Sequence, residues 1–262
     1  METISQVDLN EDVLREIVSH ADIRSVFRFC QVNKTLCHQH DDLFQHIYDR
    51  FYHETGMDVF KNKTWFHLLK LCYQLSRLFI ISSLKKYTMK ELYTMTELYL
   101  DYKNITVLPP EIGQMRHLKY LDLSHNQLSA LPPEIGKLSV LQELYLSNNQ
   151  LSTLPPEIGQ LRALQKLYLY HNQLSALPPE IGQLSALKTL YLYHNKLNTL
   201  PAEIGQLGAL KTLYLANNQL SALPPEMGKL SHLQNLTLTN NQLSALPAEM
   251  RHLCGQCITD DY

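Results

Sequence analysis

The sequence predicts an α/β solenoid, a horseshoe-shaped stack of short repeats with a parallel sheet on its concave side and short turns on its convex side. The first observation is a period of 23 residues, since a fixed period of this size is typical of solenoids. The second is a change in composition, because Gly56 is the only glycine of residues 1–94 and proline is absent there. The pattern L-x-x-L-x-L-x-x-N-x-L begins at Leu118, Leu141, Leu164, Leu187, Leu210 and Leu233.

Residues 1–94 are predicted to form an N-terminal α-helical module. Val13, Leu14 and Ile17 recur at helical spacing, and the segment from Trp65 to Leu75 is a further amphipathic stretch. No Gly/Ser-rich or Pro-rich linker separates this module from the repeats, so we expect the two parts to pack as one body. The solenoid is predicted over residues 95–262, with about seven repeats.

The first half of each repeat is predicted to be a short strand followed by a turn. In the repeat over residues 141–163, Leu144 and Leu146 alternate with polar or aromatic residues, which indicates a strand with one buried face. Asn149 follows in the turn, whereas Lys103 holds this position in a degenerate first unit that begins at Met95. An apolar residue here would leave buried backbone groups unpaired, at about 1–3 kcal/mol each. The expected asparagine ladder is Asn126, Asn149, Asn172, Asn195, Asn218 and Asn241.

The second half of each repeat is predicted to be a short convex turn. Pro155 and Pro156 fix φ and remove two donors, which favours an extended entry. The segment Glu157–Leu161 is long enough for about one helical turn, and Gly159 is expected to permit a tight exit. One repeat cannot bury its own leucines, so stacking is needed, and each buried leucine contributes about 1.5–3 kcal/mol.

Between the buried leucines, the strands are expected to present a ladder of aromatic side chains on the concave face. Tyrosine is rigid and amphipathic and is enriched where proteins bind proteins, which predicts a protein partner here. The alternative is that repeat duplication copied the tyrosines without selection for binding; Tyr170 and Tyr193 argue against it because only two repeats share them. The candidate partner-binding residues are Tyr99, Tyr145, Tyr168, Tyr170, Tyr191, Tyr193, Tyr214, His171 and His194.

Composition and motifs exclude several classes of function. The chain has 262 residues and a formal net charge of −2, so no overall basic field recruits nucleic acid, and no apolar run of about 18 residues predicts a membrane span. No signal peptide is visible, and five scattered cysteines fit a reducing compartment, so we expect an intracellular, cytoplasmic protein. No phosphate loop, HExxH motif or nucleophile elbow is present, which predicts no enzyme and no cofactor. Cys254 and Cys257 have metal-like spacing but no second pair, so no zinc is expected.

The repeats resemble the 23-residue leucine-rich repeats of Scribble-type, Ras-suppressor-type and plant intracellular proteins. The resemblance covers Met95 to Leu253 and implies the solenoid fold. In that family, the asparagine of each repeat hydrogen-bonds the backbone of its own and the neighbouring repeat.

The segment before the repeats resembles an F-box. Leu9-Asn10 stands where the family has Leu-Pro, Asp22 matches the turn between two apolar helices, and Val32-Asn33-Lys34 matches the Val-x-Lys/Arg step. F-box-like modules joined to repeats also occur in large DNA viruses of amoebae, and this arrangement is similar; for a viral protein the expected location is the host cytoplasm. The resemblance implies a cullin-ligase adaptor as partner, bound through Leu9, Val13, Leu14, Ile17 and Val26.

Two functions follow from these observations, and a third is weaker. The leading hypothesis is an F-box-like substrate receptor for an SCF-type ubiquitin ligase, holding a protein partner on the concave face. The alternative is a non-catalytic scaffold or structural interaction protein whose N-terminal helices only cap the solenoid, since the first repeat exposes leucines and a strand edge that must be covered. The third is a nucleic-acid or glycan reader that uses the stacked tyrosines.

Overall fold

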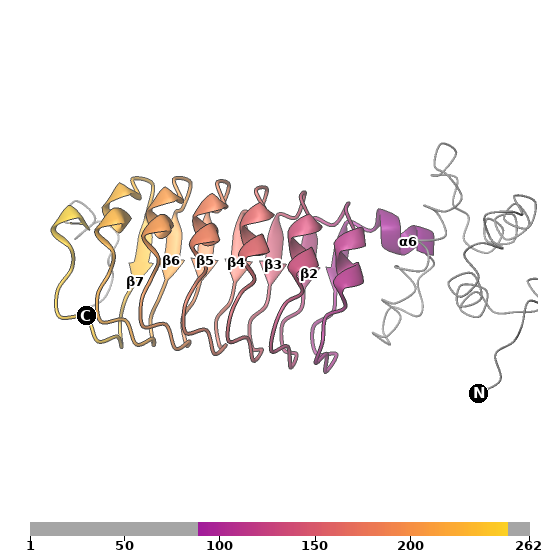
Figure 1. Ribbon diagram of the computed structural model, residues 1–262, viewed down its shortest axis with the longest axis horizontal. Coiled ribbons are helices and arrows are strands. Elements are labelled where there is room, and N and C mark those ends of the chain that lie inside the picture. Colours follow the sequence, from indigo (N-terminus) through magenta and orange to yellow (C-terminus); the bar gives the residue numbers. More distant parts are fainter. Residues whose placement is uncertain (1–88, 251–262) are drawn as a thin grey trace, which may run out of the picture.

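The described part of the chain is an elongated stack of repeats built on one parallel sheet. A computed structural model describes residues 89–250, and Figure 1 shows the repeats following one another in chain order. Seven three-residue strands pair in the order β1-β2-β3-β4-β5-β6-β7. This confirms the predicted solenoid and its parallel sheet. The strands are β1 Glu97–Tyr99, β2 Tyr120–Asp122, β3 Glu143–Tyr145, β4 Lys166–Tyr168, β5 Thr189–Tyr191, β6 Thr212–Tyr214 and β7 Asn235–Thr237.

The convex side carries one short 3-10 helix per repeat, in place of a full α-helix. The first six begin after a proline in the extended conformation; Pro155, for example, has φ −68° and ψ 145°. The helices are η4 Pro110–Gln114, η5 Pro133–Lys137, η6 Pro156–Gln160, η7 Pro179–Gln183, η8 Ala202–Gln206, η9 Pro225–Lys229 and η10 Ala248–Met250.

The sequence period sets the register of the sheet. Leu144 pairs with Leu167 and Tyr145 with Tyr168, so equivalent residues of successive repeats lie side by side. The strand hydrogen bonds continue beyond the paired residues, as where the Leu146 amide donates to the Tyr168 carbonyl at 2.9 Å. Any side chain that recurs every 23 residues therefore forms a row across the sheet.

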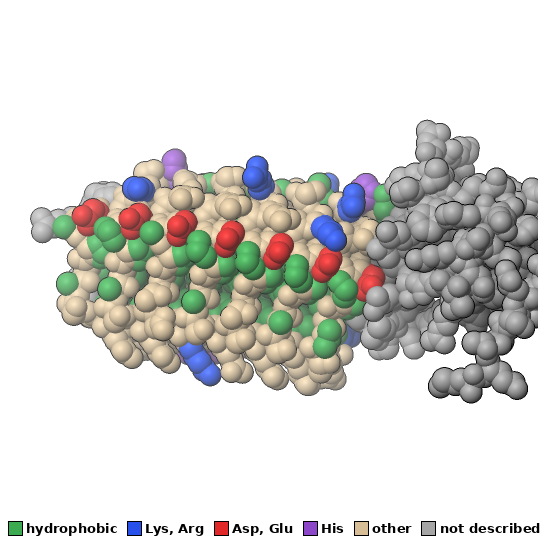
Figure 2. All heavy atoms as spheres, in the orientation of Figure 1, with side chains coloured by type: hydrophobic (Ala, Val, Ile, Leu, Met, Phe, Trp, Pro, Cys, Tyr) green, Lys and Arg blue, Asp and Glu red, His purple; other side chains and the backbone are tan. Residues whose placement is uncertain are grey.

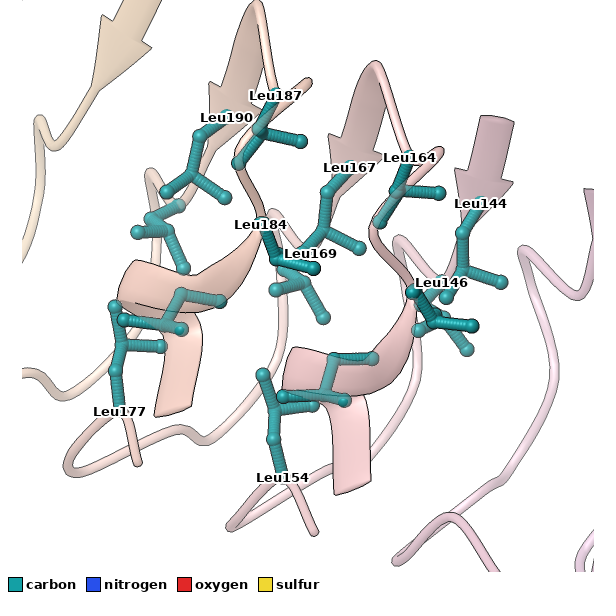
Figure 3. Packing of buried hydrophobic residues seen from close by; sticks show 14 of the residues in the cluster. Leu144, Leu146, Leu154, Leu164, Leu167, Leu169, Leu177, Leu184, Leu187 and Leu190 are labelled. Carbon is teal, nitrogen blue, oxygen red and sulfur yellow. The ribbon is translucent and has the colours of Figure 1, made fainter. Parts of the chain in front are cut away.

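The core is a continuous column of leucines between the sheet and the 3-10 helices. Leu144, Leu146, Leu164 and Leu167 are completely buried, and the close-up in Figure 3 shows leucines from adjacent repeats packed against one another. Because each repeat supplies its leucines to its neighbours, the stabilisation of about 1.5–3 kcal/mol per leucine exists only in the stack.

A short helix precedes the first repeat. Helix α6, Met89–Thr94, places Leu92 in the core with no exposed surface, and the Tyr93 ring meets His117 of the next repeat at 5.3 Å. The predicted α-helical module ends in this helix; the rest of that module, and the Cys254 and Cys257 pair, lie outside the described residues.

The structure gives the repeat glycine a different role from the one its sequence suggests. Gly159 does not have a positive φ, so the expected conformational reason for a tight exit is wrong. A Cβ on Gly159 would instead lie 2.5 Å from the carbonyl oxygen of Glu180 in the next repeat. Glycine is therefore needed because adjacent 3-10 helices pack backbone against backbone.

Candidate functional site: the concave aromatic ladder

The concave face is built from the residues that flank the buried leucine of each strand. Leu167 points into the core, so Lys166 and Tyr168 on either side of it point away from the core, and the same holds in every strand. The turn that follows each strand supplies further side chains to this face.

Tyrosine rings form one continuous ladder across the sheet. The Tyr145 and Tyr168 rings stack with centroids 4.4 Å apart, and those of Tyr191 and Tyr214 stack at 4.6 Å. Between these pairs, Tyr168 meets Tyr191 edge-on at 4.9 Å. Such pairs add about 0.5–1.5 kcal/mol each beyond the area they bury, so the ladder is a rigid surface.

The ladder includes Tyr120, which was not among the predicted binding residues. Asp122 occupies the tyrosine row on β2 and interrupts it between Tyr99 and Tyr145. The Tyr120 ring, from the other side of the same strand's buried leucine, bridges this gap at 4.8 Å from Tyr99 and 5.0 Å from Tyr145. The sequence could have indicated this role, because an aromatic residue stands two positions before Asp122, which interrupts the tyrosine row.

A second aromatic cluster lies beside the ladder on the turns after β4 and β5. Tyr170 and Tyr193 stack with centroids 4.6 Å apart, and His171 and His194 stack at 4.3 Å. Tyr191 connects this cluster to the ladder, since its ring lies 6.2 Å from that of Tyr193. The structure thus brings together eight of the nine predicted residues over β3–β6 and the turns after β4 and β5, while Tyr99 joins them only through Tyr120 and Tyr145.

The histidines of this cluster have a backbone role that sequence reasoning missed. His171 and His194 have φ of 53° and 55°, in the left-handed region, as do the equivalent Asn148 and Asn217. Asparagine and histidine are enriched in this conformation, so the turn itself favours them. Tyr102, the equivalent residue of the first unit, is 65% exposed and stacks on His125 at 4.1 Å.

Partial burial and hydrogen bonds favour the neutral form of several tyrosines of this face. Tyr145 donates a 2.6 Å hydrogen bond to Glu143, and burial together with this bond raises its pKa well above the usual range. Burial raises the pKa of Tyr120 and of Tyr193 to about 12. At neutral pH the ladder therefore offers uncharged rings and hydroxyl groups.

Beneath the turns, the asparagines of the predicted ladder bond the backbone of adjacent repeats. Asn172 donates to the carbonyl oxygens of Leu146, Leu169 and Tyr170 at 2.9, 3.0 and 3.4 Å, and its Oδ1 accepts from the Leu151 amide. Asn126, Asn149, Asn195 and Asn218 are buried in the same way, and Asn241 is partly buried at the end of the row. These bonds fix the turns on which the second aromatic cluster lies.

The described residues show no grouping of side chains suited to a metal. The residues predicted to bind the adaptor are not among the described ones. Within residues 89–250, no three His, Cys, Asp or Glu side chains are grouped as metal ligands would be. In the same range, every helix is too short or too polar to traverse a lipid bilayer. Leu9, Val13, Leu14, Ile17 and Val26 lie outside the described residues.

Fold and surface together define a repeat solenoid with an open aromatic face. The sequence model described as a leucine-rich repeat region matches residues 108–174 and 167–254, which together cover more than half of the chain. This chain belongs to the leucine-rich-repeat family. The model of the F-box domain matches residues 7–39, which confirms the second resemblance. Both domains are typically non-catalytic protein-interaction modules.

Two solved structures are similar to about two thirds of this chain. A leucine-rich-repeat protein of Leptospira interrogans is 44% identical, with a TM-score of 0.62 over 65% of this chain and 43% of its own. An internalin of Listeria monocytogenes is 23% identical, with a TM-score of 0.56 over 65% of this chain and 49% of its own, which shows the fold alone. This chain thus spans less than half the length of either protein. No curated protein matches the chain.

Proposed function

We propose that this chain is the substrate receptor of an SCF-type ubiquitin ligase. In this proposal the F-box segment binds the cullin-ligase adaptor, and the concave aromatic ladder holds the protein to be modified. The observation that carries the proposal is the presence, in one chain, of an F-box match over residues 7–39 and a repeat solenoid with an open aromatic face.

The geometry of the concave face supports a protein as the bound partner. Tyr168, Tyr170, Tyr191 and Tyr193 come from two adjacent repeats, and their rings restrain one another through stacked, edge-on and tilted contacts. Little conformational entropy is then lost when a partner covers them, and tyrosine hydroxyls at the edges can bond a peptide backbone. Such preorganised aromatic surfaces are where binding energy concentrates in protein interfaces.

The role of α6 supports a division of labour within the N-terminal module. Leu92 of this helix is fully buried against the first repeat, so α6 contributes to capping the solenoid. The F-box match ends at residue 39, well before α6 begins. Part of the cap is thus supplied from outside the matched segment, and in this proposal the apolar residues of that segment bind the adaptor.

The remaining parts of the proposal follow from the ligase role. The chain has no catalytic activity of its own, and the ligase subunits recruited through the adaptor carry out ubiquitin transfer. The protein acts in the cytoplasm, which is the host cytoplasm if the chain is viral.

Binding of purified adaptor to the full-length chain tests the proposal. Wild-type protein is expected to bind adaptor saturably, and Leu9→Ala combined with Val13→Asp to abolish binding, because F-box recognition depends on a few apolar anchors in a groove. Val107→Asp is the matched control, since it also introduces a charge at an apolar side chain, but one that is 71% exposed on the first repeat. Unchanged thermal unfolding of the repeats would show that the solenoid remains folded in the double variant.

A variant that strengthens binding completes the test. Asn10 stands where the F-box family has proline, and proline pre-sets φ for the first turn of a helix. Asn10→Pro should therefore tighten adaptor binding. Absence of binding by both wild type and Asn10→Pro would contradict the ligase role and favour the scaffold alternative.

A further inference from the structure

The charges of the concave face are separated along the aromatic ladder. Carboxylates lie on the first three strands and the turn after β1. From β4 onward, no concave position between Lys166 and Asn240 carries a carboxylate, and the charged groups there are lysines and histidines. The acidic residues are Glu97, Asp101, Asp122 and Glu143; the basic ones are Lys166, Lys188 and Lys211, with His171 and His194 beside them.

The two halves meet at one ion pair in the middle of the sheet. Lys166 Nζ lies 3.0 Å from Glu143 Oε1, and Tyr145 donates to the other oxygen of the same carboxylate. Glu143 and Lys166 thus neutralise each other at the boundary, so the outer charges on each side define the character of each half.

The two most exposed tyrosine rings lie at the outer end of the acidic half. Tyr99 is 55% exposed and Tyr102 is 65% exposed, whereas Tyr145 and Tyr168 are half-buried. Flat aromatic rings beside carboxylates suit a guanidinium, which stacks on the ring and bonds the carboxylate at the same time. Lys103, Lys119 and His125 also lie in this half; with Glu143 paired to Lys166, three carboxylates remain against the two lysines.

The basic half has the opposite character. Lys188 Nζ is held 3.0 Å from Gln165 Oε1 of the preceding repeat, which keeps the ammonium group near the sheet. The carboxylates of these repeats lie instead on the 3-10 helices. Glu157, Glu180, Glu203 and Glu226 lie in the first turns of η6, η7, η8 and η9. Figure 2 shows a line of acidic side chains along the face that carries these helices. The separation of charge is therefore particular to the concave side.

We propose that the concave face fits an extended protein segment with arginines at one end, which lie over β1–β3, and carboxylates at the other, which lie over β4–β6. This inference rests on the proposed function in that it names the chemistry of the partner. With parallel strands about 4.8 Å apart, the span from β1 to β6 is roughly 24 Å. An extended chain covers it with about seven or eight residues at ~3.3 Å each.

Two synthetic peptides of identical composition test the proposal with the full-length protein. One peptide carries its arginines together at one end and its glutamates at the other; the second alternates them. The segregated peptide should bind at least about tenfold more tightly in low salt, and the difference should vanish near 1 M salt, where the Debye length is only ~3 Å. Fluorescence anisotropy of the labelled peptides gives both affinities.

Matched variants locate the binding surface. The acidic-half variant carries Glu97→Gln, Asp101→Asn and Asp122→Asn; the amides can still accept the hydrogen bonds from Tyr99 and from the Ser124 amide. It should lose most of the preference for the segregated peptide. The control variant carries Glu157→Gln, Glu180→Gln and Glu203→Gln, which removes equal charge from the 3-10 helices and should leave that preference unchanged.

The opposite outcomes are equally clear. Equal affinity for the two peptides, no binding of either, an equal loss in the control variant, or tighter binding of a single-stranded oligonucleotide would each overturn the inference. Adaptor binding by the acidic-half variant separates this result from the ligase proposal: a variant that loses the peptide but keeps the adaptor supports the inference whatever the fate of the captured partner.

Discussion

The side-chain nitrogen of Asn172 lies 2.9 Å from the carbonyl oxygen of Leu146, which belongs to the preceding repeat. The Oδ1 atom of the same side chain accepts a 3.0 Å hydrogen bond from the amide of Leu151. One asparagine therefore bonds a carbonyl and an amide that no strand pairing reaches. The turns after the strands, and the aromatic cluster on them, are held in place by this row of buried amides.

Replacing Asn172 by alanine should destabilise the solenoid. The change leaves the buried Leu151 amide without this acceptor, at about 1–3 kcal/mol, whereas the Leu146 carbonyl still accepts from Asn149 at 3.0 Å. Urea unfolding followed by circular dichroism measures the loss. Gln150→Ala, which truncates an exposed side chain in the preceding repeat, is the control and should be nearly neutral. An equal unfolding midpoint for the two variants would rule out the asparagine row as a source of stability.

Two glycines should respond to alanine with opposite signs. Gly159→Ala places a methyl group against the Glu180 backbone, so it should destabilise by about 1–3 kcal/mol through overpacking. At Gly208 a Cβ would meet nothing within 4 Å, so Gly208→Ala should stabilise by about 0.4–1 kcal/mol by restricting the unfolded chain. Melting temperatures that move in the same direction would contradict the packing explanation.

The left-handed backbone at His171 predicts which substitutions this turn accepts. His171→Asn should leave stability almost unchanged, because Asn148 and Asn217 adopt the same φ in other repeats. His171→Val should cost about 1–2 kcal/mol, since a β-branched side chain is strained at positive φ. Chemical denaturation distinguishes the two. Similar losses for valine and asparagine would instead assign the effect to the stacked ring.

The same histidine predicts a dependence of stability on pH. Burial, with His194 and His125 nearby, lowers the pKa of His171 below its ordinary value of about 6.5. The unfolded chain then takes up the proton first, so this contribution to stability is present above pH ~6.5 and is lost as the pH falls through the lower folded pKa. Unfolding midpoints at several pH values should fall less steeply toward acid in His171→Asn than in wild type. Parallel curves would count against this assignment.

The repeating parts of the fold could be predicted from the sequence because residues that are one 23-residue period apart lie side by side in the stack. Leu144 pairs with Leu167 because they are one repeat apart, and the same shift places Tyr145 beside Tyr168. A row of side chains on the concave face therefore needs only the period and the alternation of a strand.

The features that could not be predicted depend on contacts between different positions of adjacent repeats. Tyr120 belongs to another row of the sheet. Only the ring-to-ring distances in the structure show that it fills the gap that Asp122 leaves in the tyrosine row. Gly159 looks like a turn residue until the Glu180 backbone is seen beside it. The role of His171 in a left-handed turn was hidden because its aromatic ring suggested binding alone.

The central claim is that one chain connects a ligase adaptor to a partner held on the concave face, and co-purification from cells with tagged full-length protein tests it most directly. Wild type should retrieve adaptor and partner in one complex. Leu9→Ala with Val13→Asp should lose only the adaptor. A second variant replaces Tyr168, Tyr170, Tyr191 and Tyr193 by threonine, the residue found at the equivalent positions 237 and 239 of the last repeat. This variant should lose only the partner. Retention of the same partner by the threonine variant, or loss of both proteins from either variant while it remains folded, would contradict the account.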